Sequence, residues 1–105
     1  SWPVGLELLH KYVYTTDVKD FRWELKEGKW NLTPVPLGEG MVDLSKYFGL
    51  AKKYNIPGPI ILHCDYRSGG SENGATTLTI PGTDVLKAIK KDLLVLKKIL
   101  ATAGI

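Results

Sequence analysis

The chain has 105 residues, of which 44% are hydrophobic and 24% charged, as is typical of one globular domain. No run approaches the roughly 18–20 apolar residues that a membrane span needs, so no membrane partner is expected. The single cysteine, Cys64, excludes an internal disulfide framework and favours a reducing compartment such as the cytoplasm, while an upstream signal segment stays open.

Much of the net charge of +3 lies in one segment near the end of the chain. Its lysines fall within one helical pattern: Lys87, Lys90, Lys91, Lys97 and Lys98. We interpret them as the solvated face of a helix. A nucleic-acid surface would interleave basic and aromatic residues or carry a known motif, and neither is present, so no nucleic-acid partner is expected.

The first part of the chain predicts a helix, a strand and a hairpin. Val4–Lys11 has the apolar spacing of a helix end, and Tyr12–Asp17 is rich in β-branched and aromatic residues, which favours a strand. Phe21–Asn31 contains two short arms around a Glu-Gly pair and is typical of a hairpin or a turn. Thr33–Gly40, with two prolines and two glycines, is expected to be a loop.

The middle of the chain predicts a helix, a strand and a long loop. Val42–Tyr54 repeats apolar residues at helical spacing, and Asp43 is placed to cap this helix. Pro59–Asp65 begins with a continuous apolar run, which is typical of a strand with both faces covered. Arg67–Pro81 is polar and glycine-rich, and we expect a loop there.

A last helix is expected to begin at Thr83 or Asp84, and its buried side is predicted to contain Val85, Ile89, Leu93, Leu96 and Leu100. Strands that are separated by crossover helices pair in parallel, so the pattern predicts a parallel α/β sheet. Two strands are too few for a stable open sheet. We therefore expect residues 1–105 to form a single partial domain that self-associates or associates with chain outside it.

Polar side chains gather where the two predicted strands end. Asp17 and Asp20 bracket Lys19 after the first strand, and the second strand ends on His63 and Asp65. Because side chains alternate along a strand and active sites form at the carboxyl ends of parallel strands, we expect Asp17, His63 and Asp65 to converge. Carboxylate and imidazole together can hold a divalent metal, and a carboxylate there can move a proton beside a carbonyl.

Each of these residues also has a structural interpretation. His63 would be a hydrogen-bonded histidine of the core, and Asp20 would cap the following turn. Lys19 would form an ion pair with Asp17 or Asp20. Glu39 fits a surface loop. Cys64 lies on the strand face opposite His63, so packing is a better explanation for it than metal binding.

Four segments of the sequence, taken together, resemble one family. They read "VYTTDVKDFRW", "GKWNLTPVPLGEGMVDLSKYF", "GPIILHCDY" and "VLKAIKKDLLVLKKIL". In order and spacing they are similar to the sugar phosphate isomerase/epimerase family, whose members are xylose isomerase-like (β/α)8 TIM barrels. The resemblance covers nearly all of the chain and matches the C-terminal part of such a barrel, from the end of helix six through strands seven and eight with their helices.

The resemblance implies roles for five residues. Asp17 and Asp65 fall on metal-ligand positions where the family usually has histidine and glutamate, and Asp65 also falls on an acid/base position. Lys19 and His63 would bind substrate hydroxyls or orient the carboxylate, and Arg22 lies near a substrate-binding arginine of some members. If the metal site is rebuilt around the two aspartates, it would suit a hard ion, Mn²⁺ or Mg²⁺, with Co²⁺ or Zn²⁺ as alternatives. If it is not, the two replacements mean that the metal site is degraded.

The family resemblance thus implies a metal-dependent isomerase or epimerase that moves a proton between adjacent carbons of a keto-sugar or sugar phosphate. The alternative is a non-catalytic barrel fragment with a binding or assembly role. A third hypothesis, a metal phosphodiesterase similar to endonuclease IV, would need more histidine and acidic ligands than this chain offers. On any of these hypotheses, the segment alone is not expected to be active, because the resemblance places the remaining ligands and strands outside it.

Overall fold

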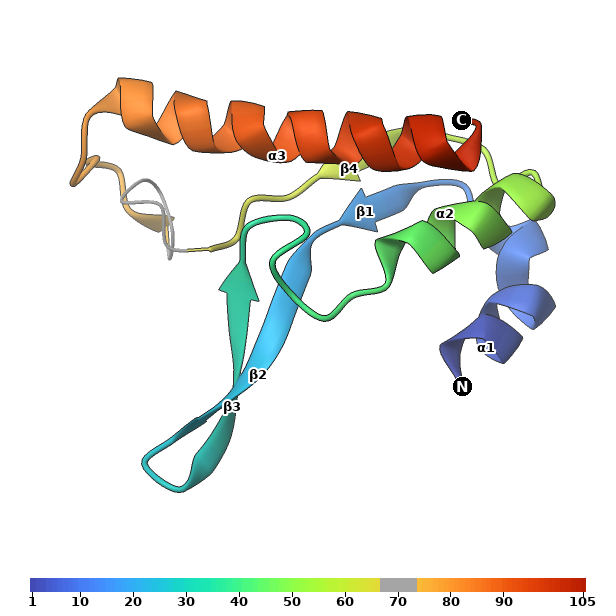
Figure 1. Ribbon diagram of the computed structural model, residues 1–105, viewed down its shortest axis with the longest axis horizontal. Helices are drawn as coiled ribbons and strands as arrows, with labels where there is room; N and C mark the ends of the chain where they lie inside the picture. Colours follow the sequence, from blue (N-terminus) through green and yellow to red (C-terminus); the bar gives the residue numbers. More distant parts are fainter. Residues whose placement is uncertain (67–73) are drawn as a thin grey trace.

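Over residues 1–66 and 74–105, the computed structural model contains three α-helices, one short 3₁₀ helix and four strands (Figure 1). In chain order these are α1 (Trp2–Leu9), η1 (His10–Tyr12), β1 (Thr16–Val18), β2 (Asp20–Lys26), β3 (Lys29–Val35), α2 (Leu44–Lys53), β4 (Ile60–Leu62) and α3 (Gly82–Ala103). Among the described residues, no helix is long and apolar enough to cross a membrane.

Strands β1 and β4 pair in parallel, which confirms the pairing expected from the order of elements. Thr16 lies opposite Ile60 and Val18 opposite Leu62. Both strands are shorter than predicted, because the parallel ladder spans only three residues in each. The predicted strand Tyr12–Asp17 was wrong at its start, since Tyr12 ends a 3₁₀ helix.

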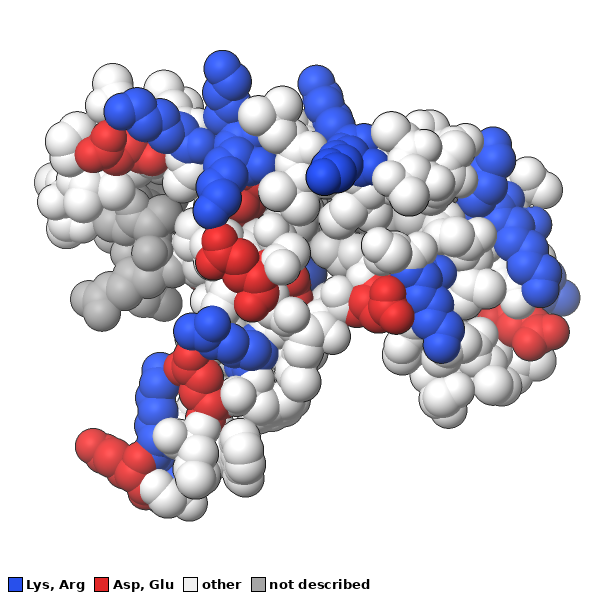
Figure 2. Space-filling model, in the orientation of Figure 1, with Lys and Arg blue, Asp and Glu red and all other residues white. Residues whose placement is uncertain are grey.

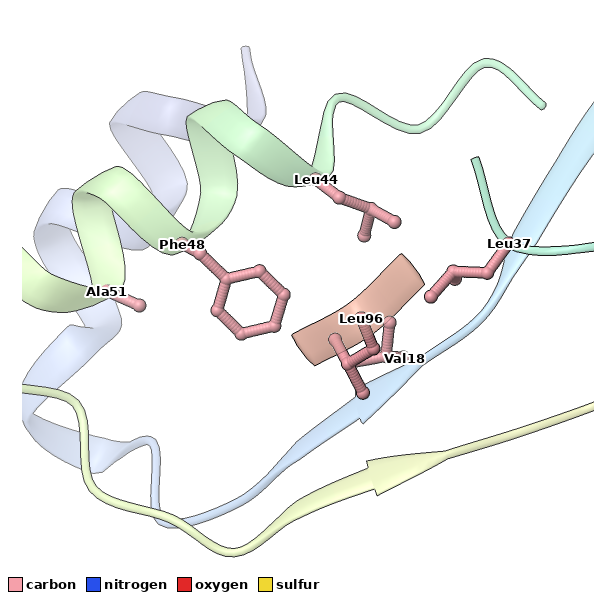
Figure 3. Close-up of a cluster of buried hydrophobic side chains, with 6 residues drawn as sticks. All are labelled: Val18, Leu37, Leu44, Phe48, Ala51 and Leu96. Atoms are coloured by element: carbon pink, nitrogen blue, oxygen red, sulfur yellow. The ribbon is translucent and has the colours of Figure 1, made fainter. Parts of the chain in front are cut away.

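Helices α2 and α3 cover the same face of this small sheet. The buried side chains between them and β1 form one cluster (Figure 3): Val18, Leu37, Leu44, Phe48, Ala51 and Leu96. Phe48 at its centre is almost fully buried, which contributes roughly 1.5–3 kcal/mol to the free energy of unfolding. The core therefore fixes one side of β1 and β4 and leaves the other side to solvent.

The opposite face of the sheet is open. Ile61 is 44% exposed, whereas its neighbours Ile60 and Leu62 pack against the core. The prediction that Pro59–Asp65 forms a strand covered on both faces is therefore wrong for this structure, because both packed helices lie on one side. Asp17, which lies opposite Ile61 in the register, is exposed on this open face.

Strands β2 and β3 form an antiparallel hairpin that projects from the body of the protein (Figure 1). Its turn lies at Glu27 and Gly28, whose φ angles of 50° and 73° fit a two-residue turn with positive φ at both positions. The hairpin prediction is confirmed, but the loop prediction for Thr33–Gly40 was wrong at its start. Thr33, Pro34 and Val35 extend β3, and proline is tolerated there because β3 is an edge strand.

The loop between β3 and α2 is organised by Asp20, which is only 3% exposed. Its carboxylate accepts hydrogen bonds from the backbone amides of Phe21 at 2.9 Å, Gly38 and Gly40 at 3.0 Å, and Val42 at 3.1 Å. A Cβ on Gly40 would collide with this carboxylate and would lie 2.5 Å from the carbonyl oxygen of Phe21. The "KD" and "PLGEG" segments are therefore two halves of one structural unit, and Asp20 has the capping role.

Helix boundaries agree with the sequence at α2 and differ at α3. Asp43 caps α2 by accepting a hydrogen bond from the amide of Lys46 at 3.0 Å, as predicted. The predicted cap of the last helix at Thr83 or Asp84 was wrong. Pro81 is the cap, because its carbonyl oxygen already accepts from the amide of Asp84 at 2.9 Å.

The buried side of α3 is also narrower than predicted. Leu96 is buried, but Ile89 and Leu93 are exposed, and Asp92 is buried instead. The five lysines of this helix are all exposed, as expected for a solvated face, and Figure 2 shows positive side chains over α3. In the loop before α3, residues 67–73 lie outside the described residues, and residues 75–81 contain no helix or strand, as predicted.

Candidate functional site

The structure brings four of the predicted site residues together where β1 and β4 end. The Nε2 atom of His63 lies 3.8 Å from Oδ2 of Asp17, and its Nδ1 atom lies 3.9 Å from Oδ1 of Asp65. The Nζ atom of Lys19 donates a hydrogen bond of 2.9 Å to Oδ2 of Asp65. We call Asp17, Lys19, His63 and Asp65 the strand-end cluster.

The geometry follows from the parallel register of the two strands. Asp17 lies within β1, and the ladder continues beyond β4 because the amide of His63 donates to the carbonyl oxygen of Val18 at 2.8 Å. Along a strand, every second side chain points to the same face of the sheet. Asp17 is paired with Ile61, so His63 and Asp65, at the next alternate positions after Ile61, lie on the face of Asp17. The alternation that predicted the convergence of Asp17, His63 and Asp65 therefore also produces it.

Lys19 and Asp65 hold each other in their charged forms. The pKa of the Lys19 ammonium is raised, mainly by its hydrogen bond to Asp65 and by the charge of that carboxylate. The pKa of Asp65 is lowered, mainly by the same hydrogen bond. The sequence had suggested Asp17 or Asp20 as the partner of Lys19. The hydrogen-bond partner is instead Asp65, because the Lys19 side chain reaches the segment that follows β4.

Every side chain of the strand-end cluster is open to solvent. The side chain of His63 is 40% exposed and that of Asp65 is 42% exposed. His63 is therefore not a core histidine, and that structural interpretation was wrong. A ligand in solution can reach the imidazole, both carboxylates and the ammonium group from the open face of the sheet.

The cluster offers the right kinds of donors for a metal, but the described residues alone do not group enough of them to enclose an ion. Two carboxylates and an imidazole suit Mn²⁺ or Mg²⁺ in kind. However, His63 lies between Asp17 and Asp65, and an oxygen of Asp65 is already bonded to Lys19. Within residues 1–66 and 74–105, no three His, Cys, Asp or Glu side chains are grouped so that they could hold an ion.

A groove with a volume of about 480 Å³ opens beside the cluster. Its lining includes Asp17 and Lys19 as well as the large side chains of Trp2, Met41 and Tyr47. The hydroxyl of Tyr47 is hydrogen-bonded to the hydroxyl of Thr16 at 2.8 Å, which fixes the ring. The groove thus combines charged groups with aromatic surface.

Arg22, the remaining predicted substrate-binding residue, lies in the hairpin. Its Nε atom donates a hydrogen bond of 2.7 Å to Glu24 within the same strand. Its observed partner is therefore a hairpin residue and not a member of the strand-end cluster.

Sequence reasoning missed one acidic residue. Asp92 is 1% exposed; its Oδ2 accepts a hydrogen bond from Sγ of Cys64 at 3.8 Å, and its Oδ1 has no hydrogen-bond partner among the described residues. Burial, and then Asp92 itself, raise the pKa values of Cys64 and Tyr66. The signal was present in the sequence, because Asp92 follows Ile89 and precedes Leu96 at helical spacing, on the side expected to be apolar.

Comparisons of the chain with protein-family models, with curated proteins and with solved structures find no match. The resemblance to the sugar phosphate isomerase/epimerase family therefore remains a prediction that rests on the sequence motifs. The chemistry available to the strand-end cluster has to be inferred from its side chains.

Proposed function

We propose that this chain supplies strands seven and eight of a xylose isomerase-like (β/α)8 barrel whose activity is that of a sugar or sugar phosphate isomerase or epimerase. The observation that carries the proposal is the meeting of carboxylates, imidazole and ammonium at the carboxyl ends of two neighbouring parallel strands. Active sites of such barrels lie at this end of the strands. The free thiol of Cys64 supports a reducing compartment such as the cytoplasm.

The packing of the sheet supports a larger assembly around it. Helices cover one face of β1 and β4, while the face with Ile61 is open. In a barrel this face would point inward and would contact side chains from other strands. In addition, α3 exposes an apolar stripe of Leu86, Ile89 and Leu93, which a neighbouring helix would cover.

The charge states of the cluster suit proton transfer at carbon. Lys19 lowers the pKa of Asp65, which keeps this side chain a carboxylate that can accept a proton from a carbon beside a carbonyl group but also makes it a weaker base than a free aspartate. Lys19 stays an ammonium group and would stabilise negative charge on the carbonyl oxygen as the proton leaves. His63, between the two carboxylates, would bind a hydroxyl group or orient Asp65.

Asp17 and Asp65 are the side chains that would hold a divalent ion, Mn²⁺ or Mg²⁺ before Co²⁺ or Zn²⁺, with further ligands from outside this chain. Such an ion would polarise the carbonyl group of the substrate. Since Lys19 now occupies an oxygen of Asp65, the ammonium group and the ion would compete. Lys19→Met is therefore expected to strengthen Mn²⁺ binding, and Asp17→Asn to weaken it, as measured by equilibrium dialysis.

A non-catalytic role is the second candidate, and the length of Asp65 favours it. Aspartate is one methylene shorter than the glutamate of the resembled family, which can displace the carboxylate by about 1 Å and reduce the rate on the order of 100-fold. The hydrogen bond to Lys19 also holds Asp65 in place without any ligand. On this alternative the protein binds sugars or assembles with other chain, but does not turn substrate over.

The first test is the length of the natural reading frame, because a barrel of this kind needs roughly 250 residues in all. The second test is isotope exchange. The intact protein would be incubated with keto-sugars and their phosphates in D₂O with Mn²⁺ or Mg²⁺, and deuterium at the carbons beside the carbonyl would be measured by NMR. Exchange is expected in the wild type and should be lost in Asp65→Asn.

Two variants complete the design. Asp65→Glu restores the missing methylene and is expected to raise the exchange rate by up to about 100-fold. Glu27→Gln, at the hairpin turn, should leave exchange unchanged. Sugar binding without exchange in every variant would favour the non-catalytic role, and cleavage of abasic DNA would favour a phosphodiesterase. If the intact protein shows no metal binding and no exchange, the isomerase proposal is overturned.

A further inference from the structure

The β2–β3 hairpin has one entirely apolar face. In its register, Phe21 pairs with Pro34, Trp23 with Leu32, and Leu25 with Trp30. Residues at alternate positions of a strand share a face, so these three cross-strand pairs form one continuous strip, which we call the apolar strip. Phe21 and Trp23 contact edge to face, with ring centroids 6.5 Å apart.

This strip is exposed except at Phe21, which is partly buried. Trp23 is 50% exposed, Leu25 60%, Trp30 68% and Leu32 50%. These are among the largest apolar side chains of the protein, and soluble proteins seldom leave such a contiguous patch uncovered. A two-stranded hairpin is also only marginally stable alone, so this one gains from a surface that covers it.

The other face of the hairpin is already satisfied. Glu24 accepts hydrogen bonds from Arg22 at 2.7 Å and Thr33 at 2.9 Å, and lies 2.7 Å from Nζ of Lys26. These contacts, of which the one with Lys26 has the largest effect, lower the pKa of Glu24 to about 2. The hairpin is therefore an amphipathic ribbon whose polar face needs no partner and whose apolar strip is the face available for binding.

The composition of the strip narrows the choice of partner. Apart from the indole N–H groups of Trp23 and Trp30, its side chains carry no polar atom, so a sugar stacked on the strip would find only these two donors and no acceptor for its hydroxyl groups. The cations Arg22, Lys26 and Lys29 belong to the opposite face, so a nucleic acid could not use the aromatic and basic groups together. A second apolar protein surface fits this strip better than either ligand.

A second copy of the same hairpin provides such a surface. Two sheets pack face to face about 10 Å apart, and two identical apolar strips can pack against each other about a two-fold axis. The hairpin projects from the body, which leaves its outer part accessible to a second copy (Figure 1). Figure 2 shows positive and negative side chains side by side on the hairpin, so no charge of a single sign on it would repel a second copy.

The area that such a contact would bury is near the lower limit for a specific dimer. The four exposed side chains offer on the order of 400 Å² per copy, from typical areas of tryptophan and leucine. With Phe21, Pro34 and the edges of the strip, the total for two copies approaches the roughly 1,000 Å² that a specific interface requires. We propose that the apolar strip of the β2–β3 hairpin is the interface of a symmetric homodimer of this protein.

The test is sedimentation equilibrium of the purified protein over about 5–500 μM, a range that covers micromolar dissociation constants. We expect a concentration-dependent mass that rises from the monomer value of 11.6 kDa per 105-residue chain towards twice that value. Trp30→Lys should raise the dissociation constant at least about 10-fold, because buried tryptophans dominate interface energies. Lys26→Thr, on the polar face, should leave it unchanged.

A second variant guards against misfolding. Should circular dichroism show Trp30→Lys unfolded, Leu25→Thr removes apolar surface with a residue that favours strands, and the same rise in the dissociation constant is expected. A monomer at every concentration would overturn the proposal, as would a dimer that persists in both variants. The proposal would also be overturned if Lys26→Thr weakened dimerisation as much as Trp30→Lys does. The same holds if the protein bound anionic phospholipid vesicles and did not dimerise. The proposal is independent of the isomerase activity, because no member of the strand-end cluster lies in the hairpin.

Discussion

The role of Asp20 as the anchor of the loop before α2 can be tested by the substitution Asp20→Asn. In the wild type, Oδ1 accepts from the amides of Phe21 and Val42, and Oδ2 accepts from those of Gly38 and Gly40. Asparagine has one oxygen, so it can keep two of these bonds, and its amide group would face two backbone donors.

Each hydrogen bond to a charged group is worth about 1.5–3 kcal/mol, and an unpaired buried donor costs about 1–3 kcal/mol. Because Gly38 and Gly40 lie at the surface, water can recover part of this loss. We therefore expect Asp20→Asn to lower the free energy of unfolding by roughly 3 kcal/mol, a large part of the 5–15 kcal/mol that is usual for a domain.

The assay is urea denaturation followed by far-ultraviolet circular dichroism, with an m-value that stays constant between variants. Asp43→Asn is the matched control, because asparagine caps a helix as well as aspartate does and the expected change is below about 0.5 kcal/mol. Gly40→Ala should destabilise the same loop through its clash with Asp20. Equal stability of Asp20→Asn and Asp43→Asn would refute the anchoring role.

Three further predictions concern the thiol, the ion pair and the hairpin turn. The pKa of Cys64 is raised by burial and then by Asp92, so iodoacetamide at neutral pH should alkylate the folded protein more slowly than the protein unfolded in urea. Asp92→Asn should accelerate alkylation of the folded protein. Equal rates in folded and unfolded protein would contradict this prediction. Because Lys19 lowers the pKa of Asp65, the pair stabilises the fold above the ordinary carboxyl pKa, and this contribution is lost as the pH falls through the lowered value. Lys19→Met should raise the Asp65 pKa towards its ordinary value in a carboxyl NMR titration, and an unchanged titration would count against the pairing. Gly28→Ala should destabilise the protein by about 1 kcal/mol, because the residue has a φ of 73°, and a thermal midpoint equal to that of the wild type would speak against a strained turn.

Much of the secondary structure was predictable because its signals are local. The Glu27-Gly28 pair indicated the turn, and Asp43 indicated the start of α2. The convergence at the strand ends was also predictable, since alternation along β1 and β4 needs only a parallel register. The predicted ends of the strands were less accurate, because a strand ends where its hydrogen bonds to the partner strand end, and that depends on the partner.

Other features depend on partners far along the chain. Asp20 is buried because amides 18 to 22 residues away fold over its carboxylate, and the residues nearest to it in sequence give no sign of this. Asp92 is buried through its contact with Cys64, 28 residues earlier. The partner of Lys19 is Asp65 and not one of the nearer acids, because β4 lies beside β1 in space.

The amino-acid sequence therefore determined the order of the elements, the hairpin, the cap of α2 and the type of residue at the strand ends, since each depends on neighbours within a few positions. Only the tertiary structure decided which face of the sheet is covered, which acid is buried and which cation neutralises Asp65. Ile61 shows the difference most plainly: its sequence context is that of a buried strand, yet it is exposed, because both packed helices lie on the other face. Burial depends on which surfaces meet, and that information is distributed over the whole chain.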